Sequence, residues 1–386
     1  MRAGLGVVLV GLVVCVGCQL GPNAGESRPT PDKVIDAIKK LRGNVEVDKN
    51  KAVVSVRLAG YQIYDSELLH LKGLTNLKKL SLRSTKVTDA GLVHLKGLTN
   101  LQTLILWSTK VTDAGLEHLE GLTELKWLVL VGIKVTDVGL AHLKGLTKLK
   151  TLRLRGIKVT DAGLEHLEGL TKLEYFGLSD TMVTDAGLVH LKGLTKLEKL
   201  SISGPKFADA GLEHLKGLAN LQTLILMATD VTDAGLVHLK GLTHLKELWL
   251  TGSNVTDAGM AHLKELTNLT YLDLTDNAVT DAGLAHLKEL TNLTYLDLAD
   301  TRVTDAGIKK LRQALPNCDI NEPVPYCLSP GASLRVVGGH SVWDFSSLET
   351  EVSLDFAAFT IRHPASTPKT PPKTAPRTPP PRPPIS

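Results

Sequence analysis

Aromatic residues and cysteines are scarce in this chain of 386 residues. Aromatic side chains make up 4% of the residues and there are only four cysteines, whereas 43% of the residues are hydrophobic, mostly Leu and Val. Ample apolar material with few rings suits a repetitive core better than a globule with one centre. The formal net charge of +4, from 44 basic and 40 acidic residues, gives no global field that would favour nucleic acid.

Sequence motifs of enzymes are also lacking. The chain contains no nucleophile elbow, P-loop, H-E-x-x-H or dinucleotide-binding fingerprint. An active site needs one asymmetric cluster of unlike groups, and a repeated phrase does not provide one. We therefore predict a protein that is not an enzyme and that has no cofactor.

One 24-residue phrase fills most of the chain instead. The segment Val87-Thr88-Asp89-Ala90-Gly91-Leu92 recurs with small variations and without insertions, and its ten copies begin at Val87, Val111, Val135, Val159, Val183, Phe207, Val231, Val255, Val279 and Val303. A fixed period of this length is the signature of a solenoid, in which each unit buries its apolar face against its neighbours. A degenerate eleventh unit, with Val56, Leu58 and Ile63 in apolar positions, precedes the set.

Each unit predicts one strand, one turn and one short helix. Leu80-Ser81-Leu82 alternates apolar and polar residues, as a half-buried strand does, and helical spacing begins at Leu92. Thr88 is a suitable N-cap, Asp89 stands where the helix dipole favours a carboxylate, and Gly97 is expected to end the helix in a left-handed conformation. Strands stack about 4.8 Å apart and helices need about 10 Å, so the stack must curve with its strands inside.

The phrase L-x-x-L-x-L-x-x-T-x-V-T-D-A-G-L-x-H-L resembles the leucine-rich repeat family, with Thr, or Asn277, where the family has Asn or Cys. The resemblance covers about residues 53–320. It implies an α/β leucine-rich repeat solenoid, a curved right-handed horseshoe with parallel strands on the concave face and short helices on the convex face. Ile133, Ile157 and Pro205 replace the polar residue, so we expect the hydrogen-bonded ladder at that position to be interrupted there.

Two narrower resemblances bear on function. The V-T-D-A-G-L-x-H-L variant resembles exported repeat proteins of planctomycete-type bacteria, and the helical half of the unit resembles the substrate-binding arms of F-box proteins. The first implies an exported protein. The second implies a substrate-recognition arm, which would need an N-terminal F-box helix pair; residues 1–52 offer a signal-like run and one helix instead.

The N-terminal end predicts export. Residues 1–18 carry Arg2 followed by an apolar run that is short for a membrane span, which is typical of a signal peptide. Gly17-Cys18 resembles the end of a bacterial lipobox, so Cys18 is the expected lipidation site of a lipoprotein; ordinary secretion and an uncleaved anchor are the alternatives. Residues 19–30 are interpreted as a flexible leash, and residues 31–52, with a short helix and a strand, as an N-terminal cap.

The repeats are expected to span residues 53–320 in about 11 units, including a C-terminal cap with a last helix over 305–314 and a last edge strand over 318–320. Residues 321–363 are a degenerate extension in which two alternating runs could form a hairpin. Residues 364–386, with ten Pro and four basic residues, are expected to be a disordered tail. For Cys318 and Cys327, a disulfide and two free thiols are both open.

Two polar ladders follow the predicted helices. One His stands at the same position in ten successive units, from His70 to His286; we interpret it as packing against the next helix and donating to a nearby carbonyl, because helices about 10 Å apart cannot share one zinc ion. Sensing of pH and surface metal capture are the functional alternatives. The Asp ladder, from Asp65 to Asp305, is interpreted as stabilising helix N-termini, because one Asp per turn is a poor supply of the oxygens that calcium needs.

What varies between copies lies on the strands. The side chains flanking the two inward Leu, at positions 79, 81 and 83 and every 24 residues thereafter, should face solvent on the concave side. These 30 positions hold three of the four Trp and three of the six Tyr, and they change from basic to acidic along the chain. Protein interfaces are enriched in such rings, although rings also simply suit exposed strands. The expected contact residues are Trp107, Trp127, Arg153, Arg155, Tyr175, Trp249, Tyr271, Asp273, Tyr295 and Asp297.

These observations predict a non-enzymatic, exported recognition scaffold of the cell envelope, lipid-anchored or else periplasmic or extracellular. Its expected partner is a protein bound on the concave face. A carbohydrate such as peptidoglycan, for which the rings would be stacking platforms, is one alternative, and a substrate-recognition arm of a ubiquitin-ligase-like complex is another. Nucleic acid is not expected as a partner, and contact with a membrane is expected only through the lipid anchor.

Overall fold

The computed structural model of the chain describes residues 31–323. They form one 13-stranded sheet in which the strands are neighbours in sequence order. All adjacent strands are parallel except β1 and β2, which are antiparallel. The strands are β1 (Asn44–Val47), β2 (Val53–Ala59), β3 (Lys79–Arg83), β4 (Thr103–Trp107), β5 (Trp127–Val131), β6 (Thr151–Arg155), β7 (Tyr175–Ser179), β8 (Lys199–Ser203), β9 (Thr223–Met227), β10 (Glu247–Trp249), β11 (Tyr271–Asp273), β12 (Tyr295–Asp297) and β13 (Asp319–Asn321).

Each strand from β2 to β12 is followed by a short helical segment. Several segments are wholly or partly 3-10 helix, which is common in helical pieces this short. The α-helices are α1 (Pro31–Lys40), α2 (Asp65–Leu68), α3 (Asp89–Leu92), α4 (Asp113–Leu116), α5 (Asp137–Ala141), α6 (Asp161–Glu165), α7 (Asp209–Glu213), α8 (Asp233–Leu236), α9 (Asp257–Leu263), α10 (Asp281–Leu287) and α11 (Asp305–Ala314). The 3-10 segments are η1 (Leu69–Leu71), η2 (Val93–Leu95), η3 (Glu117–Leu119), η4 (Asp185–Leu191) and η5 (Val237–Leu239).

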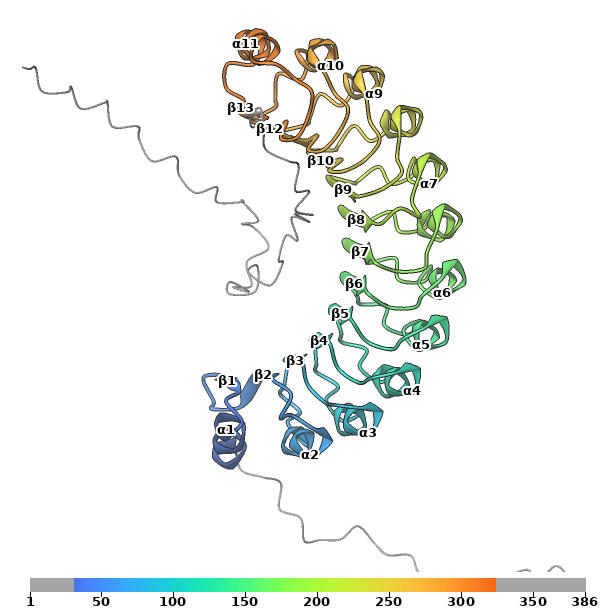
Figure 1. The fold of residues 1–386 in the computed structure, drawn as a ribbon. Helices are drawn as coiled ribbons and strands as arrows, with labels where there is room; N and C mark the ends of the chain where they lie inside the picture. Colours follow the sequence, from blue (N-terminus) through green and yellow to red (C-terminus); the bar gives the residue numbers. More distant parts are fainter. Residues whose placement is uncertain (1–30, 324–386) are drawn as a thin grey trace, which may run out of the picture. The chain divides into compact units, whose positions relative to one another are not determined.

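Within residues 31–323, the strands line the inner side of an arc and the helices line its outer side (Figure 1). The predicted α/β leucine-rich repeat solenoid, with concave strands and convex helices, is therefore confirmed. The antiparallel β1 is the exception to the predicted parallel sheet. It forms a hairpin with β2, and α1 packs beside this hairpin with Val34 and Ile38 buried.

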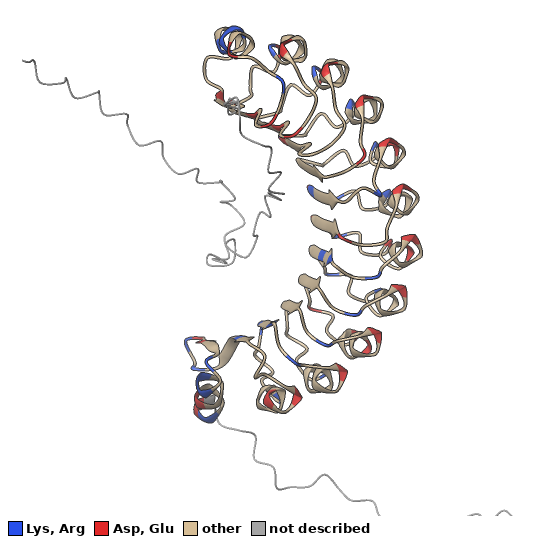
Figure 2. Cartoon of the chain, viewed as in Figure 1, with Lys and Arg blue, Asp and Glu red and all other residues tan. Residues whose placement is uncertain are grey.

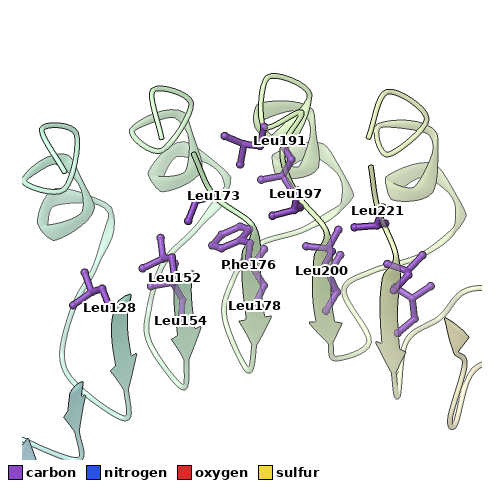
Figure 3. Packing of buried hydrophobic residues seen from close by; sticks show 14 of the residues in the cluster. Leu128, Leu152, Leu154, Leu173, Phe176, Leu178, Leu191, Leu197, Leu200 and Leu221 are labelled. Carbon is purple, nitrogen blue, oxygen red and sulfur yellow. The ribbon is translucent and has the colours of Figure 1, made fainter. Parts of the chain in front are cut away.

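The core is a continuous column of buried Leu side chains that runs through all the repeats. Leu128, Leu152, Phe176 and Leu200 occupy the same register position of four successive strands, and all four are fully buried. Figure 3 shows these side chains pointing between the strands and the helices, each next to its equivalents in the adjacent repeats. Burying one such side chain contributes about 1.5–3 kcal/mol. Each repeat thus obtains its stability from contacts with its neighbours.

A carboxylate clamp joins each helix to the next repeat. Asp137, the first residue of α5, accepts hydrogen bonds from the backbone N–H of Thr160 to Oδ1 at 2.7 Å and from the Thr160 hydroxyl to Oδ2 at 2.6 Å. A Cβ at Gly163 would collide with Asp137 Oδ1, so the absence of a side chain there admits the carboxylate. The Asp ladder was predicted to stabilise its own helix N-terminus. It does occupy the first turn, but its hydrogen bonds run to the following unit.

Ten such clamps follow one another, and nine of them have both hydrogen bonds. The exception is Asp185, because Ala208 replaces Thr and only the backbone N–H of Ala208 donates, at 2.8 Å. The complete clamps join Asp65 to Thr88, Asp89 to Thr112, Asp113 to Thr136, Asp137 to Thr160, Asp161 to Thr184, Asp209 to Thr232, Asp233 to Thr256, Asp257 to Thr280 and Asp281 to Thr304.

Two local predictions about the helical half were wrong. Gly97 is not in the left-handed region, because the chain continues through Lys96 with right-handed helical angles; at this position of the repeat only Gly73, in the degenerate unit, has positive φ. In the other repeats this turn is therefore made without a left-handed glycine.

The His ladder differs from its prediction as well. No carbonyl accepts from these rings among the hydrogen bonds of residues 31–323; Nδ1 of His142 instead lies 2.6 Å from Oε1 of Glu120, and Nδ1 of His190 lies 2.6 Å from Oε1 of Glu168. Where the residue 22 positions earlier is Lys rather than Glu, four His have a buried Nδ1 with no hydrogen-bond partner in the described range, and these are His118, His166, His214 and His238.

The polar ladder between the strands and the helices is interrupted more widely than predicted. Ile133 and Ile157 are buried at its polar position, as expected, but the Thr85 and Thr109 hydroxyls also lack hydrogen-bond partners within residues 31–323. A connected ladder appears only later. There the Thr229 and Ser253 hydroxyls are 3.1 Å apart, and the side chain of Asn277 donates to the carbonyl of Leu250 at 2.7 Å.

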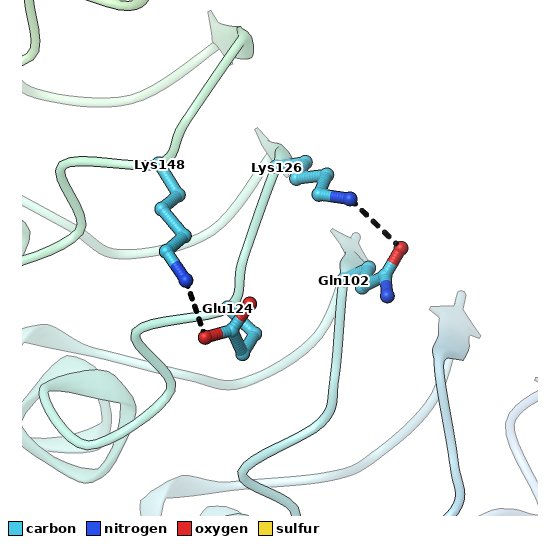
Figure 4. A network of polar contacts seen from close by, with 4 residues as sticks. All are labelled: Gln102, Glu124, Lys126 and Lys148. Atoms are coloured by element: carbon cyan, nitrogen blue, oxygen red, sulfur yellow. Dashed lines mark hydrogen bonds and ion pairs between the residues drawn. The ribbon is translucent and has the colours of Figure 1, made fainter.

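Polar pairs with the same 24-residue spacing run along the loops between helices and strands. Lys148 Nζ donates to Glu124 Oε1 at 2.5 Å, and Lys126 Nζ donates to Gln102 Oε1 at 3.4 Å (Figure 4). Lys148 holds the pKa of the Glu124 carboxyl below its usual value. Exposed pairs of this kind contribute about 0–1 kcal/mol each. The buried Leu and the clamps therefore contribute most of the stability of the repeating scaffold, which we call the frame.

Candidate functional site

The variable side chains stand on the concave face because a strand alternates its side chains between two faces. In β3 the two Leu are buried, and the flanking Lys79, Ser81 and Arg83 are partly exposed; β4 and β8 show the same pattern. The concave positions are therefore the first, third and fifth residues of each repeat strand, counted from Lys79 in β3. The face departs from the pattern at β5, where Val129 and Val131 are buried.

The concave positions of β3–β8 form what we call the basic half. Arg83 lies over the ring of Trp107, with its guanidinium carbon 4.4 Å from the ring centroid, and Lys199 Nζ lies 6.0 Å from the ring centroid of Tyr175. Arg155 Nε donates to Asp180 Oδ2 at 3.2 Å. Arg83, Lys199 and Arg155 thus have partners within the protein, either a ring or a carboxylate.

Burial affects the ionisable groups of the basic half. It lowers the pKa of Lys199, although Glu247 acts in the opposite direction, and it lowers the pKa of Arg83. Burial also raises the pKa of the Tyr175 phenol. These shifts follow from the cost of holding a charge in a partly desolvated place.

The concave positions of β10–β13 form what we call the acidic half, and its centre is a stack of three rings. The ring centroids of Trp249 and Tyr271 are 4.5 Å apart and those of Tyr271 and Tyr295 are 5.0 Å apart, with interplanar angles of 24° and 12°. Because the rings belong to three successive strands, Tyr271 lies between the other two. Both faces of its ring are therefore covered, and the stack is held rigid.

Carboxylates surround this stack. Asp273 and Asp297 are register partners on β11 and β12, Glu247 begins β10, and Asp319 begins β13. Asp273 is only 6% exposed, and its Oδ1 accepts from the backbone N–H of Thr275 at 2.8 Å. None of the ion pairs within residues 31–323 includes any of these four carboxylates.

The surroundings of the acidic half disfavour negative charge. Burial raises the pKa of the Asp273 carboxyl, and the charge of Asp297 adds to this effect although the hydrogen bond from Thr275 opposes it. Burial, with Asp297 as the next cause, raises the pKa of Tyr295 to about 12, and burial together with Asp273 raises the pKa of Tyr271 still further. The half thus holds negative charge at a cost that a bound cation would reduce.

Figure 2 shows the change of charge along the arc, with Lys and Arg on strands of the basic half and Asp and Glu on β10–β12. The predicted contact residues divide between the two halves. Trp107 lies on β4, Trp127 on β5, Arg153 and Arg155 on β6 and Tyr175 on β7, whereas Trp249 lies on β10, Tyr271 and Asp273 on β11, and Tyr295 and Asp297 on β12.

The expected exposure of these residues is only partly found. Trp127 and Trp249 are partly rather than fully exposed, Asp273 is buried, and the indole N–H of Trp249 is buried with no hydrogen-bond acceptor in the described range. Asp319 and Asn321 were missed as site residues; continuing the 24-residue register one unit past Tyr295 and Asp297 would have found them. Asn321 donates to Asp297 Oδ1 at 2.9 Å.

Other candidate chemistry falls partly outside the described residues. Cys18, the predicted lipidation site, and Cys327 lie outside them, whereas Cys318 is buried, and burial together with Asp319 raises its thiol pKa to about 11. Over residues 31–323, no group of three or more His, Cys, Asp or Glu is placed to hold a metal ion. In the same range there is no helix with the length and hydrophobicity of a membrane span.

The comparison with protein families decides the family. The sequence model described as "Leucine-rich repeat region" matches residues 55–338, which is well over half of the chain. The chain belongs to the leucine-rich repeat family. Members of this family mediate protein–protein recognition and are typically non-enzymatic scaffolds. Among curated proteins, none matches this leucine-rich repeat chain.

A solved structure agrees with the fold. The internalin InlF of Listeria monocytogenes is 21% identical, with a TM-score of 0.53, and the match covers 76% of this chain and 94% of that one. The Arabidopsis receptor kinase HAESA, in complex with the peptide hormone IDA and the co-receptor SERK1, is 20% identical with a TM-score of 0.48, over 67% of this chain and 44% of that one. At this identity the likeness to InlF concerns the fold alone.

Proposed function

We propose that this leucine-rich repeat chain is an exported, non-enzymatic scaffold that binds a protein partner through its concave face. The observation that carries the proposal is the contrast between a frame that repeats every 24 residues and a concave face that holds six of the ten Trp and Tyr residues and segregates its charge. A surface required only for folding would have no reason to vary while the frame stays constant. Rings and charges on rigid strands are the kind of anchor that dominates protein interfaces.

Ring geometry favours a protein over a glycan. A sugar stacks on the open face of a ring, but Tyr271 is covered on both faces by its neighbours, and Arg83 covers a face of Trp107. The middle ring of the acidic half therefore has no open face on which a sugar could stack. A glycan array is the direct check, and binding to a defined glycan that is lost in Trp249→Ala would favour the carbohydrate alternative.

The ubiquitin-ligase alternative has less support. Within residues 31–64, between the start of the described range and α2, the structure has one helix, α1, followed by the β1–β2 hairpin. This segment packs on the end of the solenoid core. An F-box helix pair would have to lie elsewhere in the chain.

The experiment compares concave and convex variants at matched folding. Tagged full-length protein is used to capture partners from surface fractions of the source cells, and the captured protein is then titrated against Trp127→Ala, Trp249→Ala, His142→Ala and Glu165→Ala. Each Trp change should cost about 2 kcal/mol of binding free energy, and the two convex changes should cost much less. If the convex variants lose binding while both Trp variants keep it, the partner binds the helices instead.

Export is a separate part of the proposal and has its own test. Cys18→Ser would remove the acyl anchor, so the variant should leave the detergent phase into which the natural protein partitions. A variant that still partitions into detergent would refute lipidation at Cys18 without affecting the proposed concave interface.

A further inference from the structure

We propose that the acidic half, at β10–β13, is the binding site for a cationic segment of the protein partner, with Arg or Lys side chains placed between the carboxylates of Asp273 and Asp297. The inference rests on the proposed function and adds the chemistry of the partner. It starts from an imbalance of charge on one sheet surface. The concave positions of β10–β13 contain four carboxylates and neither Lys nor Arg.

The placement of two carboxylates is the first argument. Asp273 and Asp297 lie side by side as register partners on adjacent parallel strands, whose backbones lie about 4.8 Å apart. Like charges directly opposite each other on a sheet destabilise it. A cation lying over both would turn this repulsion into attraction, and the protein provides no ion pair to either group within residues 31–323.

The burial of Asp273 is the second argument. The residue is only 6% exposed, and its hydrogen bonds come from neutral donors, including the backbone N–H of Thr275. A buried carboxylate normally has a cationic partner, because desolvation otherwise costs more than the hydrogen bonds return. We therefore expect the partner protein to supply this cation.

The surroundings fit an organic cation better than a metal ion. In the described range no three acidic or imidazole groups converge as metal ligands, whereas a guanidinium needs only one or two carboxylates in its plane. The Trp249–Tyr271–Tyr295 stack adjoins the carboxylates, with the Tyr295 hydroxyl 3.4 Å from Asp297 Oδ2, and its rings can pack against the methylene stem of Arg or Lys. Arg should bind better than Lys because its planar fork can contact two carboxylates at once.

The basic half restricts a cationic segment to one end of the concave face. Its positive side chains, such as Arg83, Arg155 and Lys199, already lie on rings or near acids of the same chain. A cationic segment would be repelled from β3–β8 and attracted to β10–β13. One end of the arc is thus marked for the positive part of a partner, which would fix the orientation of that partner along the sheet.

The test uses the full-length protein and a fluorescent hexa-arginine peptide, with hexa-lysine and hexa-glutamate as comparison probes, measured by anisotropy at low and moderate salt. The double variant Asp273→Asn with Asp297→Asn should weaken hexa-arginine binding about tenfold or more. The matched control is Glu117→Gln with Glu165→Gln, which removes the same charge from exposed convex positions and should weaken binding less than about twofold. Melting curves of both pairs check that folding is retained.

Each outcome decides the proposal. A loss confined to the concave pair, with hexa-arginine binding better than hexa-lysine and hexa-glutamate not binding, supports it. An equal loss in both pairs would mean attraction by net charge alone and would overturn it, as would unchanged binding in the concave pair. Calcium that binds the natural protein but not the concave variant, without any peptide binding, would replace it with a metal site.

The partner captured in the earlier experiment separates the two proposals. If that partner loses affinity in Trp127→Ala but keeps it in the Asp273→Asn and Asp297→Asn pair, the concave interface stands and the cationic contact falls. If neither set of concave variants changes its affinity, the proposed function itself falls.

Discussion

The two halves of the concave face stand on the same frame and carry opposite charge. At the concave positions of β3–β8 the charged residues are all basic, namely Lys79, Arg83, Arg153, Arg155 and Lys199. At those of β10–β13 they are all acidic, namely Glu247, Asp273, Asp297 and Asp319. The Leu positions and the Asp clamps beneath both halves are the same. The side chains of a strand alternate between the concave surface and the core. The chemistry of the surface can therefore change completely without altering the core.

The halves also differ in how they accommodate charge. In the basic half, cations lie over rings or pair with an acid of the same chain, as Arg83 does with Trp107 and Arg155 with Asp180. In the acidic half, the carboxylates of Asp273 and Asp297 have only neutral hydrogen-bond donors. Arg83 and Arg155 thus have a partner that stabilises their charge, whereas Asp273 and Asp297 have no cation beside them within residues 31–323. This difference is what makes the acidic half the better candidate for a charged partner.

The largest expected effect concerns the frame that the halves share. Leu152 under the basic half and Leu272 under the acidic half are both fully buried at the same position of their repeats. Leu152→Asp and Leu272→Asp should each destabilise the protein by about 4 kcal/mol or more, because an unpaired carboxylate would be buried in the Leu column. Urea denaturation followed by circular dichroism measures both. A cost at Leu272 much smaller than at Leu152 would show that the two frames are not equivalent.

A smaller effect is expected from breaking a clamp. Asp137→Ala beneath the basic half and Asp257→Ala beneath the acidic half each leave a Thr backbone N–H and hydroxyl without an acceptor, which costs about 1–3 kcal/mol. Asp185→Ala should cost less, because Ala208 offers only its N–H. The same denaturation series orders the three variants. Equal losses at Asp185 and Asp137 would mean that the hydroxyl bond contributes nothing.

The sequence predicted most of the frame because a strand and a short helix each have their own spacing of hydrophobic residues, which can be recognised within one repeat. The alternation at Leu80 and Leu82 and the helical spacing after Leu92 are such patterns, and the last helix, Asp305–Ala314, was placed at the observed residues. The clamp was missed because it joins Asp137 to Thr160 in the next repeat, where the contact depends on how adjacent units pack. No pattern within one unit contains that information.

The site was predictable as a face but not as contacts. Sequence position placed Trp249, Tyr271 and Tyr295 on neighbouring strands, and their stacking depends on side-chain rotamers that a register does not determine. Asp273 was expected in solvent and is only 6% exposed, which its position in the register does not determine. The chemistry of the acidic half therefore depends on local packing between strands.

A third prediction tests the charge imbalance through pH. Asp273→Asn should raise the melting temperature at pH 7, because the variant removes a buried carboxylate and can keep the bond from the Thr275 N–H. A carboxyl whose folded-state pKa is raised costs nothing at pH values below its unfolded pKa of about 3.9, and it costs most above its folded-state pKa. The gain should therefore disappear near pH 3. Asp297→Asn is the control and should gain less, since Asp297 accepts bonds from Ala299 and Asn321. A loss of stability in Asp273→Asn at pH 7 would contradict the imbalance.

The smallest expected effect is a gain at the repeat between the two halves. Ala208 follows the last strand of the basic half and stands where nine other clamps have Thr, and Asp185 already accepts its N–H at 2.8 Å. In Ala208→Thr the new hydroxyl would donate to the second oxygen of Asp185, and it should stabilise the protein by about 0.5–1.5 kcal/mol. Ala208→Val has a similar shape without the hydroxyl and should give no such gain. Because the site lies beneath the boundary, the gain should leave hexa-arginine binding to the acidic half unchanged; a variant that stabilises the frame and also alters that binding would show that frame and face are coupled.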